Sequence, residues 1–439
     1  MPSKRLRERK TRKRIFVKTF GCTLNQADGE LIATLAKQKG YSIVDSEGRA
    51  QAVIVNSCGV KPATEEKIIA YIQKIAKTKP KKKIVVCGCL PAINFKRVKT
   101  AFPQAFIFGA ASPEKVVAAL ASNAKPVVDL KGSEATTIKC RANTKIRHNL
   151  VARIPIAYGC RGACAFCGTR AARGQLASVP LRSIVKEVRR AAAQGALELR
   201  LTAQDAGCWG FDFKPKKTLV DLLKSVNSLK GDFLCRVGMM NPEHAAKMMP
   251  ELAKQIGGPR FFKFVHLPLQ SGSDKVLKAM NRAYTVKQFK LLVRDFRRAL
   301  PDLMIATDVI VGFPTETEAD FKKTLKVMRE IKFDLVNVSK YGHRPTAPAS
   351  RLKALPDGLV KKRAIEALAL AREIAAQRNQ RFVGRYLDVR FAEGAAKGGV
   401  LGRSPEYAPV ISKRNAKLGE IRRVKIIGAS AAWLEATPA

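Results

Sequence analysis

Residues 160–167 read Cys-Arg-Gly-Ala-Cys-Ala-Phe-Cys, and Gly-Thr-Arg-Ala-Ala-Arg-Gly follows at 168–174. Cys160, Cys164 and Cys167 therefore lie in one short segment with C-x3-C-x2-C spacing. A thiolate is a soft anionic ligand that suits the iron of an iron–sulfur cluster. Tetrahedral zinc sites usually need four ligands, and no fourth cysteine or histidine lies nearby. The spacing favours a cluster with three protein ligands and one open iron over zinc or three incidental thiols.

Length and composition indicate a globular protein of two or three domains. The chain has 439 residues, 10 cysteines and a formal net charge of +47. Grouped cysteines without an apolar export signal favour a reducing cytoplasm, and no apolar run is long enough to span a bilayer. The charge favours a polyanionic partner such as RNA. A basic bias shared by the whole proteome would explain the same charge without RNA.

The first third of the chain alternates between strand and helix patterns. After a basic arm at residues 1–14, this alternation over 15–135 predicts an α/β domain with a parallel sheet. Cys22, Cys58 and Cys89 each follow a predicted strand. Because the carboxyl ends of parallel strands meet at one edge of a sheet, we expect the three thiols to converge there. The alternative is three separate buried cysteines.

A polar, aperiodic stretch at 136–150 predicts a linker, and residues 151–375 then repeat strand and helix six times. This pattern predicts a partial (βα)6 barrel with its chemistry at the carboxyl ends of the strands. The three-cysteine loop follows the first of these strands. The other polar candidates at this rim are Glu198, Gln204, Asp205, Arg236, Asn241, His266, Gln270 and Gly312. His266 is equally explained as a hydrogen-bonded barrel histidine, and Gly312 as part of a turn.

A long helix over 356–381 leads into a C-terminal domain at 376–439 that consists of short strands and turns. We expect this domain to be separable from the rest, so that truncation before residue 381 leaves both cysteine-containing domains whole.

The residues around the cysteine loop resemble those of a known family. The C-x3-C-x2-C motif with Phe166 before its last cysteine resembles the radical S-adenosylmethionine (SAM) superfamily. The step from Phe166-Cys167 to Ala172-Arg173-Gly174 and Ser178 resembles the methylthiotransferases. The resemblance implies that Cys160, Cys164 and Cys167 hold a [4Fe–4S] cluster that cleaves SAM reductively. It also places SAM against the barrel rim listed above.

The N-terminal cysteines fit the same resemblance. Gly21-Cys22, Asn56-Ser57-Cys58 and Gly88-Cys89-Leu90 resemble the N-terminal domain of methylthiotransferases, in which three thiolates hold a second [4Fe–4S] cluster. The family motif has glycine directly before its ligand, which selects Cys89 and leaves Cys87 as a strand residue. Residues 402–410 resemble the loop of a TRAM domain, a small RNA-binding β-barrel, which makes Arg403 and Tyr407 candidate RNA contacts. The alternative is an ordinary β-domain that packs on the barrel.

Three stretches resemble the archaeal and eukaryotic-type branch of the family. They are residues 167–176, 204–207 and 236–242. The branch converts N6-threonylcarbamoyladenosine at position 37 of tRNA to its 2-methylthio derivative. Alternatives are methylthiolation of isopentenyladenosine-37 or of a ribosomal-protein aspartate, or a non-catalytic RNA-binding protein. The resemblance implies a cytoplasmic monomer that binds the tRNA anticodon loop, takes electrons from a donor such as ferredoxin or flavodoxin, and has no membrane anchor.

Overall fold

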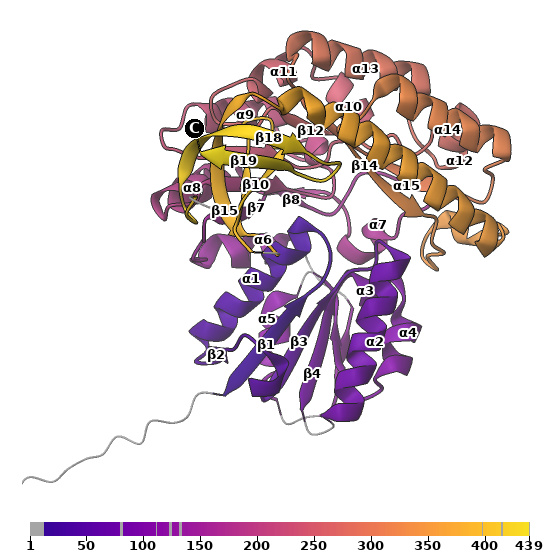
Figure 1. Cartoon of the computed structure of the whole chain (residues 1–439). Helices are drawn as coiled ribbons and strands as arrows, with labels where there is room; N and C mark the ends of the chain where they lie inside the picture. The colour runs from indigo at the N-terminus through magenta and orange to yellow at the C-terminus, as the bar shows by residue number, and fades with distance from the viewer. Residues whose placement is uncertain are drawn as a thin grey trace, which may run out of the picture. The chain divides into compact units, whose positions relative to one another are not determined.

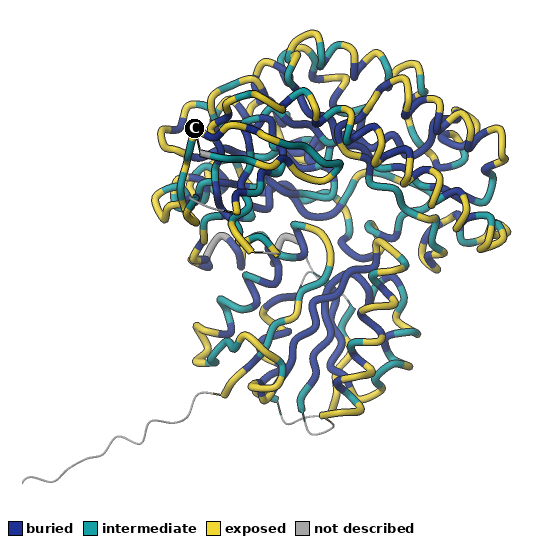
Figure 2. Tube along the Cα trace, viewed as in Figure 1, coloured by how far each residue is buried: buried dark blue, intermediate teal, exposed yellow. Residues whose placement is uncertain are grey.

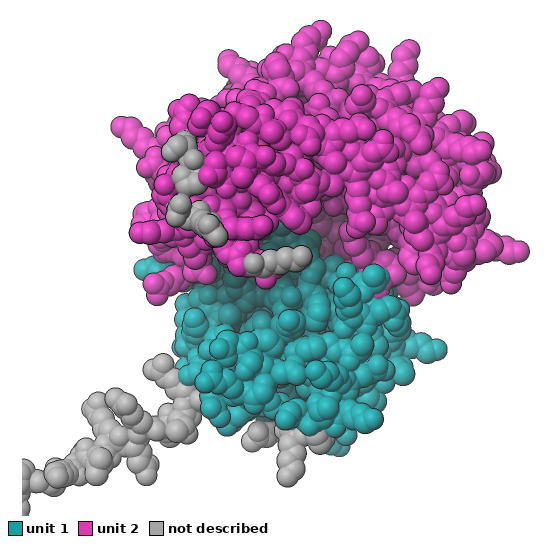
Figure 3. All heavy atoms as spheres, in the orientation of Figure 1, with its two compact units in different colours: residues 1–59, 63–146 teal, residues 60–62, 147–439 magenta. Residues whose placement is uncertain are grey.

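The computed structural model describes residues 13–79, 82–110, 112–122, 125–130, 134–396, 398–413 and 416–438. The predicted basic arm therefore lies outside the described residues up to position 12. The chain divides into two compact units (Figure 3). Residues 1–59 and 63–146 form the first unit, and residues 60–62 and 147–439 form the second.

The first unit is built on a sheet of parallel strands, as the sequence pattern predicted. In spatial order the strands are β2 (Ser42–Ile43), β1 (Arg14–Thr19), β3 (Ala52–Ser57), β4 (Lys83–Gly88), β5 (Phe106–Phe108) and β6 (Val128–Asp129). The central strand β3 is buried along its whole length, so both of its faces need apolar cover. Figure 2 shows the contrast between these buried strands and the partly exposed helices.

Helices supply that cover on both faces of the sheet (Figure 1). One face packs against α1 (Thr23–Gln38) and α5 (Pro113–Ala118). The other packs against α2 (Pro62–Thr78), α3 (Cys89–Ile93) and α4 (Phe95–Ala101). Successive residues of a strand point to opposite faces, and accordingly Ile54 belongs to the first core whereas Val53 and Val55 belong to the second. The two cores hold the carboxyl ends of β1, β3 and β4 in a fixed order.

The linker predicted at 136–150 is wrong in its first part, because helix α6 spans Glu134–Asn143. Cys140 packs with Leu31 and Ile146 in a small apolar cluster of the first unit. Arg141 donates a hydrogen bond from Nη1 to the carbonyl oxygen of Ala27 at 3.1 Å. Buried positions in this helix are occupied by threonine, cysteine and arginine rather than aliphatic residues, so the sequence shows little helical periodicity there.

The second unit contains the predicted arc of six parallel strands. Three form a sheet in the order β11 (Leu234–Val237), β10 (Glu198–Thr202) and β7 (Val151–Pro155). Three more form a sheet in the order β12 (Phe264–His266), β13 (Met304–Val311) and β14 (Leu335–Lys340). An isolated parallel bridge between Cys235 and Phe261 connects the two sheets. The partial (βα)6 barrel is therefore confirmed.

Helices follow the strands of this arc in sequence order. They are α8 (Leu181–Ala193), α9 (Leu219–Asn227), α10 (Pro242–Ala246), α11 (Glu251–Ile256), α12 (Asp274–Ala279), α13 (Val286–Ala299) and α14 (Glu318–Ile331). Polar capping fixes where several begin. The side chain of Thr317, for example, accepts a hydrogen bond from the backbone of Asp320, whose carboxylate accepts one in return.

A closed five-stranded barrel ends the chain, as the sequence predicted, after helix α15 (Asp357–Asn379). Its strands are β15 (Tyr386–Gly394), β16 (Val400–Arg403), β17 (Pro409–Ser412), β18 (Ile421–Ala429) and β19 (Leu434–Pro438). One apolar core is shared between this barrel and the strand arc, with Phe264 and Met304 packed among Phe391 and Val410. Within the described residues, no helix combines the length and apolar character needed to cross a bilayer.

Candidate functional site

The three-cysteine loop begins where the chain turns away from the first strand of the arc. A short hairpin of β8 (Ala157–Tyr158) and β9 (Ala177–Ser178) flanks it, with α7 (Thr169–Arg173) between. Gly159 has φ +67°, and a Cβ there would lie 1.8 Å from the carbonyl oxygen of Gln175. Only glycine fits this position, which aims the following cysteine out of the hairpin.

The segment after α12 holds the loop from its other side. The amide of Ala165 donates to the carbonyl oxygen of Met280 at 3.0 Å. The Asn281 side chain, whose backbone φ is +56°, donates from Nδ2 to the carbonyl oxygen of Ala163 at 2.8 Å. Phe166 packs into an apolar cluster that contains Met280 and Phe313. The loop is therefore fixed by backbone pairing and by the aromatic residue that precedes its last cysteine.

Each sulfur of the loop accepts one N–H donor. The Gly162 amide donates to Cys160 Sγ at 3.2 Å, and the Thr169 amide donates to Cys167 Sγ at 3.4 Å. Arg282 Nη1 donates to Cys164 Sγ at 3.0 Å. Burial raises the pKa of the Cys160 thiol to about 12, so without a bound metal this thiol stays protonated at neutral pH. Three converging donors suit sulfurs that carry negative charge, and the loop therefore fits an iron–sulfur cluster.

Asp205 lies at the centre of a hydrogen-bonded group beside this loop. Its Oδ1 accepts from the amides of Gly207 at 2.9 Å and Asn241 at 3.1 Å. Its Oδ2 accepts from Asn241 Nδ2 at 2.7 Å and pairs with His244 Nδ1 at 2.8 Å. Possible ligand atoms of Asp205, Cys208 and His244 all lie within 4.8 Å of one another. Because both carboxylate oxygens already have partners, this group positions the rim rather than offering free acceptors.

The fourth and fifth strands bring a second polar group to the rim. His266 Nε2 lies 3.0 Å from Asp308 Oδ2, and Asn337 Nδ2 donates to Asp308 Oδ1 at 2.9 Å. Burial raises the pKa of Asp308, but the hydrogen bonds and charge interactions with His266 and the hydrogen bond from Asn337 together leave the pKa below its ordinary value. His266 is thus hydrogen-bonded within the barrel, as one of the two sequence interpretations held.

Two glutamine side chains of the predicted set carry unused acceptors. Gln270 has a backbone φ of +64° and is only 8% exposed. Its Oε1 atom and that of Gln204 are buried without a hydrogen-bond partner. Since buried polar atoms are normally paired, these two oxygens are available to donors of a bound molecule.

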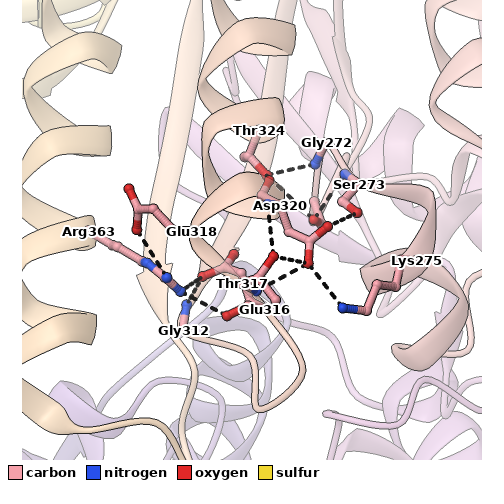
Figure 4. Close-up of polar contacts among 11 residues, drawn as sticks. Gly272, Ser273, Lys275, Gly312, Glu316, Thr317, Glu318, Asp320, Thr324 and Arg363 are labelled. Carbon is pink, nitrogen blue, oxygen red and sulfur yellow. Dashed lines mark hydrogen bonds and ion pairs between the residues drawn. The ribbon is translucent and has the colours of Figure 1, made fainter.

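Gly312 serves the turn chemistry that the sequence also allowed (Figure 4). It has φ +76°, and a Cβ there would lie 2.6 Å from two carbons of Val360. Its amide donates to Glu316 Oε2 at 2.7 Å, and Arg363 Nη1 donates to the same oxygen at 2.9 Å. The amide is occupied within the protein, so Gly312 could meet SAM by close backbone approach but not through that amide, and its contact with SAM stays a prediction.

The same network fixes the loop that follows Gln270 (Figure 4). Gly272 donates its amide to Thr324 Oγ1 at 2.9 Å, and Ser273 Oγ donates to Asp320 Oδ1 at 2.7 Å. Helix α14 thereby anchors the loop after β12, whereas Glu316, which precedes that helix, binds the turn after β13.

Four residues that were predicted to contact SAM or RNA lie where the C-terminal barrel packs on the strand arc. Tyr407 donates from its hydroxyl to Glu198 Oε1 at 2.7 Å, and Glu198 is the first residue of β10, at the end of the strand opposite the rim. The Arg236 guanidinium lies 5.0 Å from the centroid of the Phe264 ring and 5.5 Å from that of Tyr407. Arg403 lies 4.9 Å from the same Tyr407 ring. These side chains hold the C-terminal barrel on the strand arc, so the predicted roles of Glu198 and Arg236 in SAM binding, and of Arg403 and Tyr407 in RNA binding, are corrected.

The first unit brings its three predicted cysteines to one sheet edge. Cys58 and Cys89 directly follow β3 and β4, and Cys22 comes three residues after the end of the neighbouring strand β1. A Cβ on Gly21 would lie 2.7 Å from the sulfur of Cys58, so the backbone before Cys22 approaches that cysteine closely. Cys87 instead packs among apolar residues of the sheet core. Cys87 is therefore a strand residue, and Cys22, Cys58 and Cys89 stay the predicted ligands.

Buried amides hold that edge together. Asn25 Nδ2 donates to the carbonyl oxygens of Phe20 at 2.6 Å and Ser57 at 3.1 Å. Asn56 Nδ2 donates to the carbonyl oxygen of Asn25 at 2.7 Å. These bonds join the ends of β1 and β3 to the first turn of α1, next to Cys22.

Sequence reasoning missed Arg282, Asn281 and His244. Arg282 and Asn281 follow a helix rather than a strand, so a search of strand ends passes over them. His244 lies three residues after Asn241, a spacing that places both on one helical face. That spacing is the sequence feature by which His244 could have been predicted.

Two family models match the chain. The Uncharacterized protein family UPF0004 matches residues 14–109, and the Radical SAM superfamily matches residues 154–328. Among solved structures, a radical S-adenosylmethionine methyltransferase from Kitasatospora setae, with cobalamin and a [4Fe-4S] cluster bound, has a TM-score of 0.55 at 14% identity. The match covers 77% of this chain and 74% of that one. At that identity the likeness shows the fold alone.

Curated relatives match along almost the whole chain. A "Probable threonylcarbamoyladenosine tRNA methylthiotransferase" of Methanothermobacter thermautotrophicus is 36% identical over 96% of this chain and 98% of the relative. One of the same name from Archaeoglobus fulgidus is 37% identical over 94% and 96%. A "tRNA-2-methylthio-N(6)-dimethylallyladenosine synthase" of Chloroflexus aurantiacus is 33% identical over 97% and 91%. The chain therefore belongs to the radical SAM tRNA methylthiotransferase family, together with the archaeal members named for threonylcarbamoyladenosine.

Proposed function

We propose that this protein converts N6-threonylcarbamoyladenosine at position 37 of tRNA to its 2-methylthio derivative. The observation that carries the proposal is the three-cysteine loop at the carboxyl end of the strand arc, with one N–H donor on each sulfur. The names of archaeal relatives that match at least 94% of the chain support the substrate. We also propose a cytoplasmic monomer with a low-potential electron donor such as ferredoxin or flavodoxin.

The chain's own residues divide the work between two clusters. Cys160, Cys164 and Cys167 hold one [4Fe–4S] cluster at the rim, and Cys22, Cys58 and Cys89 hold a second in the first unit. When bound, the clusters and SAM supply reductive SAM cleavage, a sulfur atom and a methyl group. Three thiolates leave one iron of each cluster without a protein ligand.

The polar residues at the barrel rim orient SAM and fix the geometry of the site. The unpaired Oε1 atoms of Gln204 and Gln270 accept hydrogen bonds from SAM, whose ammonium, ribose and adenine groups offer donors. Asp205 and Asn241 support the rim through the hydrogen bonds between them, and His266 supports it through the bond between its Nε2 and Asp308. The arrangement keeps the donors and acceptors at the rim in a fixed geometry.

A substrate competition tests the proposal against its nearest alternative. Reconstituted full-length protein is incubated anaerobically with SAM, a reductant and two tRNAs, one with threonylcarbamoyladenosine-37 and one with isopentenyladenosine-37. We expect methylthiolation of the first tRNA. Preferential modification of the second would assign the chain to the activity named for the Chloroflexus relative.

Cys89→Ala should remove the second cluster, whereas Cys87→Ala should leave it in place. Cys89 begins α3 at the sheet edge, but Cys87 is 2% exposed and packs in the core. We therefore expect Cys89→Ala to halve the iron content and stop methylthiolation while SAM cleavage continues. Iron analysis and the two activities check this, and loss of the second cluster in Cys87→Ala alone would reverse the assignment.

The RNA contacts of the C-terminal barrel need a new location, because Arg403 and Tyr407 are engaged with the strand arc. We propose the outer face of β15 and β18. Tyr386 is 50% exposed there. The Lys425 Nζ lies 5.9 Å and the Arg423 guanidinium 6.0 Å from its ring centroid. An exposed aromatic ring between two cations suits a base or ribose beside phosphates.

Replacing the two cations of this face, Arg423→Gln with Lys425→Gln, should weaken tRNA binding and reduce its salt dependence. Each lost phosphate contact removes about 0.7–0.9 from the slope of log K against log salt, so the double variant should lose about 1.4–1.8. Lys361→Gln with Lys362→Gln removes the same charge from exposed positions of α15 and serves as the matched control. Equal slopes in both double variants would exclude this face as the RNA contact.

A further inference from the structure

We propose that Arg282 is a positioning residue that fixes the Cys164 sulfur and sets the reduction potential of the cluster on the three-cysteine loop. This inference rests on the proposed function, since it assumes that the loop holds a cluster.

The Arg282 guanidinium uses all three of its nitrogens. Nη1 donates to Cys164 Sγ at 3.0 Å, and Nη2 donates to Asn241 Oδ1 at 2.6 Å. Nε donates to the Tyr284 hydroxyl at 3.2 Å, and that hydroxyl donates onward to the carbonyl oxygen of Pro268 at 2.7 Å. Because a guanidinium is planar, three bonds in different directions fix its orientation. The Nη1–H group is thereby held in its hydrogen bond to the Cys164 sulfur.

Neighbouring contacts make the segment rigid. Met280 and Asn281 pair with Ala165 and Ala163 of the cysteine loop. Asn241, the partner of Nη2, in turn donates to Asp205. The chain of contacts therefore runs from the cluster ligand through Arg282 to the group beside the predicted SAM position.

Charge gives this contact a consequence for electron transfer. An arginine stays protonated in proteins, so a full positive charge lies beside one cluster ligand. Glu243 and Asp205 are the acidic groups facing the cysteine sulfurs, and both disfavour negative charge there. Reduction adds an electron to the cluster, and hydrogen bonds and charge near the sulfurs set its potential. Removing the Arg282 charge should therefore lower the reduction potential.

Potentiometric titration of the reconstituted full-length protein, followed by electron paramagnetic resonance, tests this directly. A Cys22→Ala/Cys58→Ala/Cys89→Ala background identifies the signal of the loop cluster. We expect Arg282→Gln to decrease the ratio of reduced to oxidised cluster at a fixed potential by at least about tenfold, which is about 59 mV for one electron. Arg282→Lys keeps the positive charge but loses the planar set of N–H donors, and its reduction potential should lie between those of the wild type and Arg282→Gln. Lys278→Gln, on the exposed side of α12, is the matched control and should match the wild type.

Two results would overturn the proposal. One is an Arg282→Gln protein that keeps its iron and has the wild-type potential. If Arg282→Gln fails to hold a cluster, the neutral variant Arg282→Met takes its place, and the second contradicting result is a wild-type potential in that variant. No tRNA is present in the titration, so failure to modify tRNA would contradict the proposed function without touching this result.

Discussion

Cys160→Ala is expected to lose half of the bound iron and all SAM cleavage. Two four-iron clusters give about eight irons per chain, and loss of the loop cluster leaves about four. The two remaining thiolates are not expected to hold the cluster, because the groups that contact the loop sulfurs are N–H hydrogen-bond donors, which cannot bind iron. The second cluster should survive, since its cysteines belong to the first unit.

Cys208→Ala is the matched control for that experiment. Cys208 is fully buried near Asp205, and its Sγ donates to the Asp205 carbonyl oxygen at 3.2 Å. If it is not a ligand, its removal leaves the iron content unchanged. A wild-type protein with only four irons would contradict the second cluster, and iron loss in Cys208→Ala would make Cys208 a metal ligand in addition to the loop cysteines.

Truncation before residue 381 is expected to unfold the second unit. This reverses the sequence-based expectation that the C-terminal barrel can be removed cleanly. The shared core would lose its cover over Leu234, Phe262, Phe264, Met304 and Ala306. Exposing each large apolar side chain costs about 1.5–3 kcal/mol, against a total stability of about 5–15 kcal/mol for a typical domain. The measurements are soluble yield and thermal unfolding of the truncated chain.

A milder variant tests the same contact without the risk of aggregation. Tyr407→Phe removes the hydroxyl that donates to buried Glu198. We expect a loss of about 1–3 kcal/mol in the free energy of unfolding, because a buried carboxylate loses a donor. Tyr386→Phe deletes the same hydroxyl from an exposed ring and should change stability little. A soluble, cooperatively folding truncated chain together with equal stability of the two point variants would show that the barrel is separable.

Strand patterns and strand-end cysteines predicted most of the architecture. Cys22, Cys58 and Cys89 could be placed together because parallel strands end at one edge, and that argument needs only order and periodicity. The direction of a side chain within the barrel is a different question. Glu198 and Arg236 lie on barrel strands, but both contact Tyr407, which is distant in the sequence.

Contacts that join distant segments explain the remaining misses. Arg282 lies after a helix, and its role depends on Cys164, which is 118 residues away in the chain. Helix α6 escaped notice because its buried positions include Cys140 and Arg141 rather than aliphatic residues. Periodicity within a segment reports how that segment packs, whereas these features depend on the segments that pack against it.

Mass spectrometry of tRNA nucleosides tests the central claim most directly. The chain is expressed in cells that make threonylcarbamoyladenosine but lack its methylthiolation, with the Cys160→Ala variant as the matched control. We expect 2-methylthio-N6-threonylcarbamoyladenosine with the wild-type chain and only N6-threonylcarbamoyladenosine with the variant. Absence of the methylthio nucleoside from cells that contain wild-type protein with both clusters loaded would contradict it.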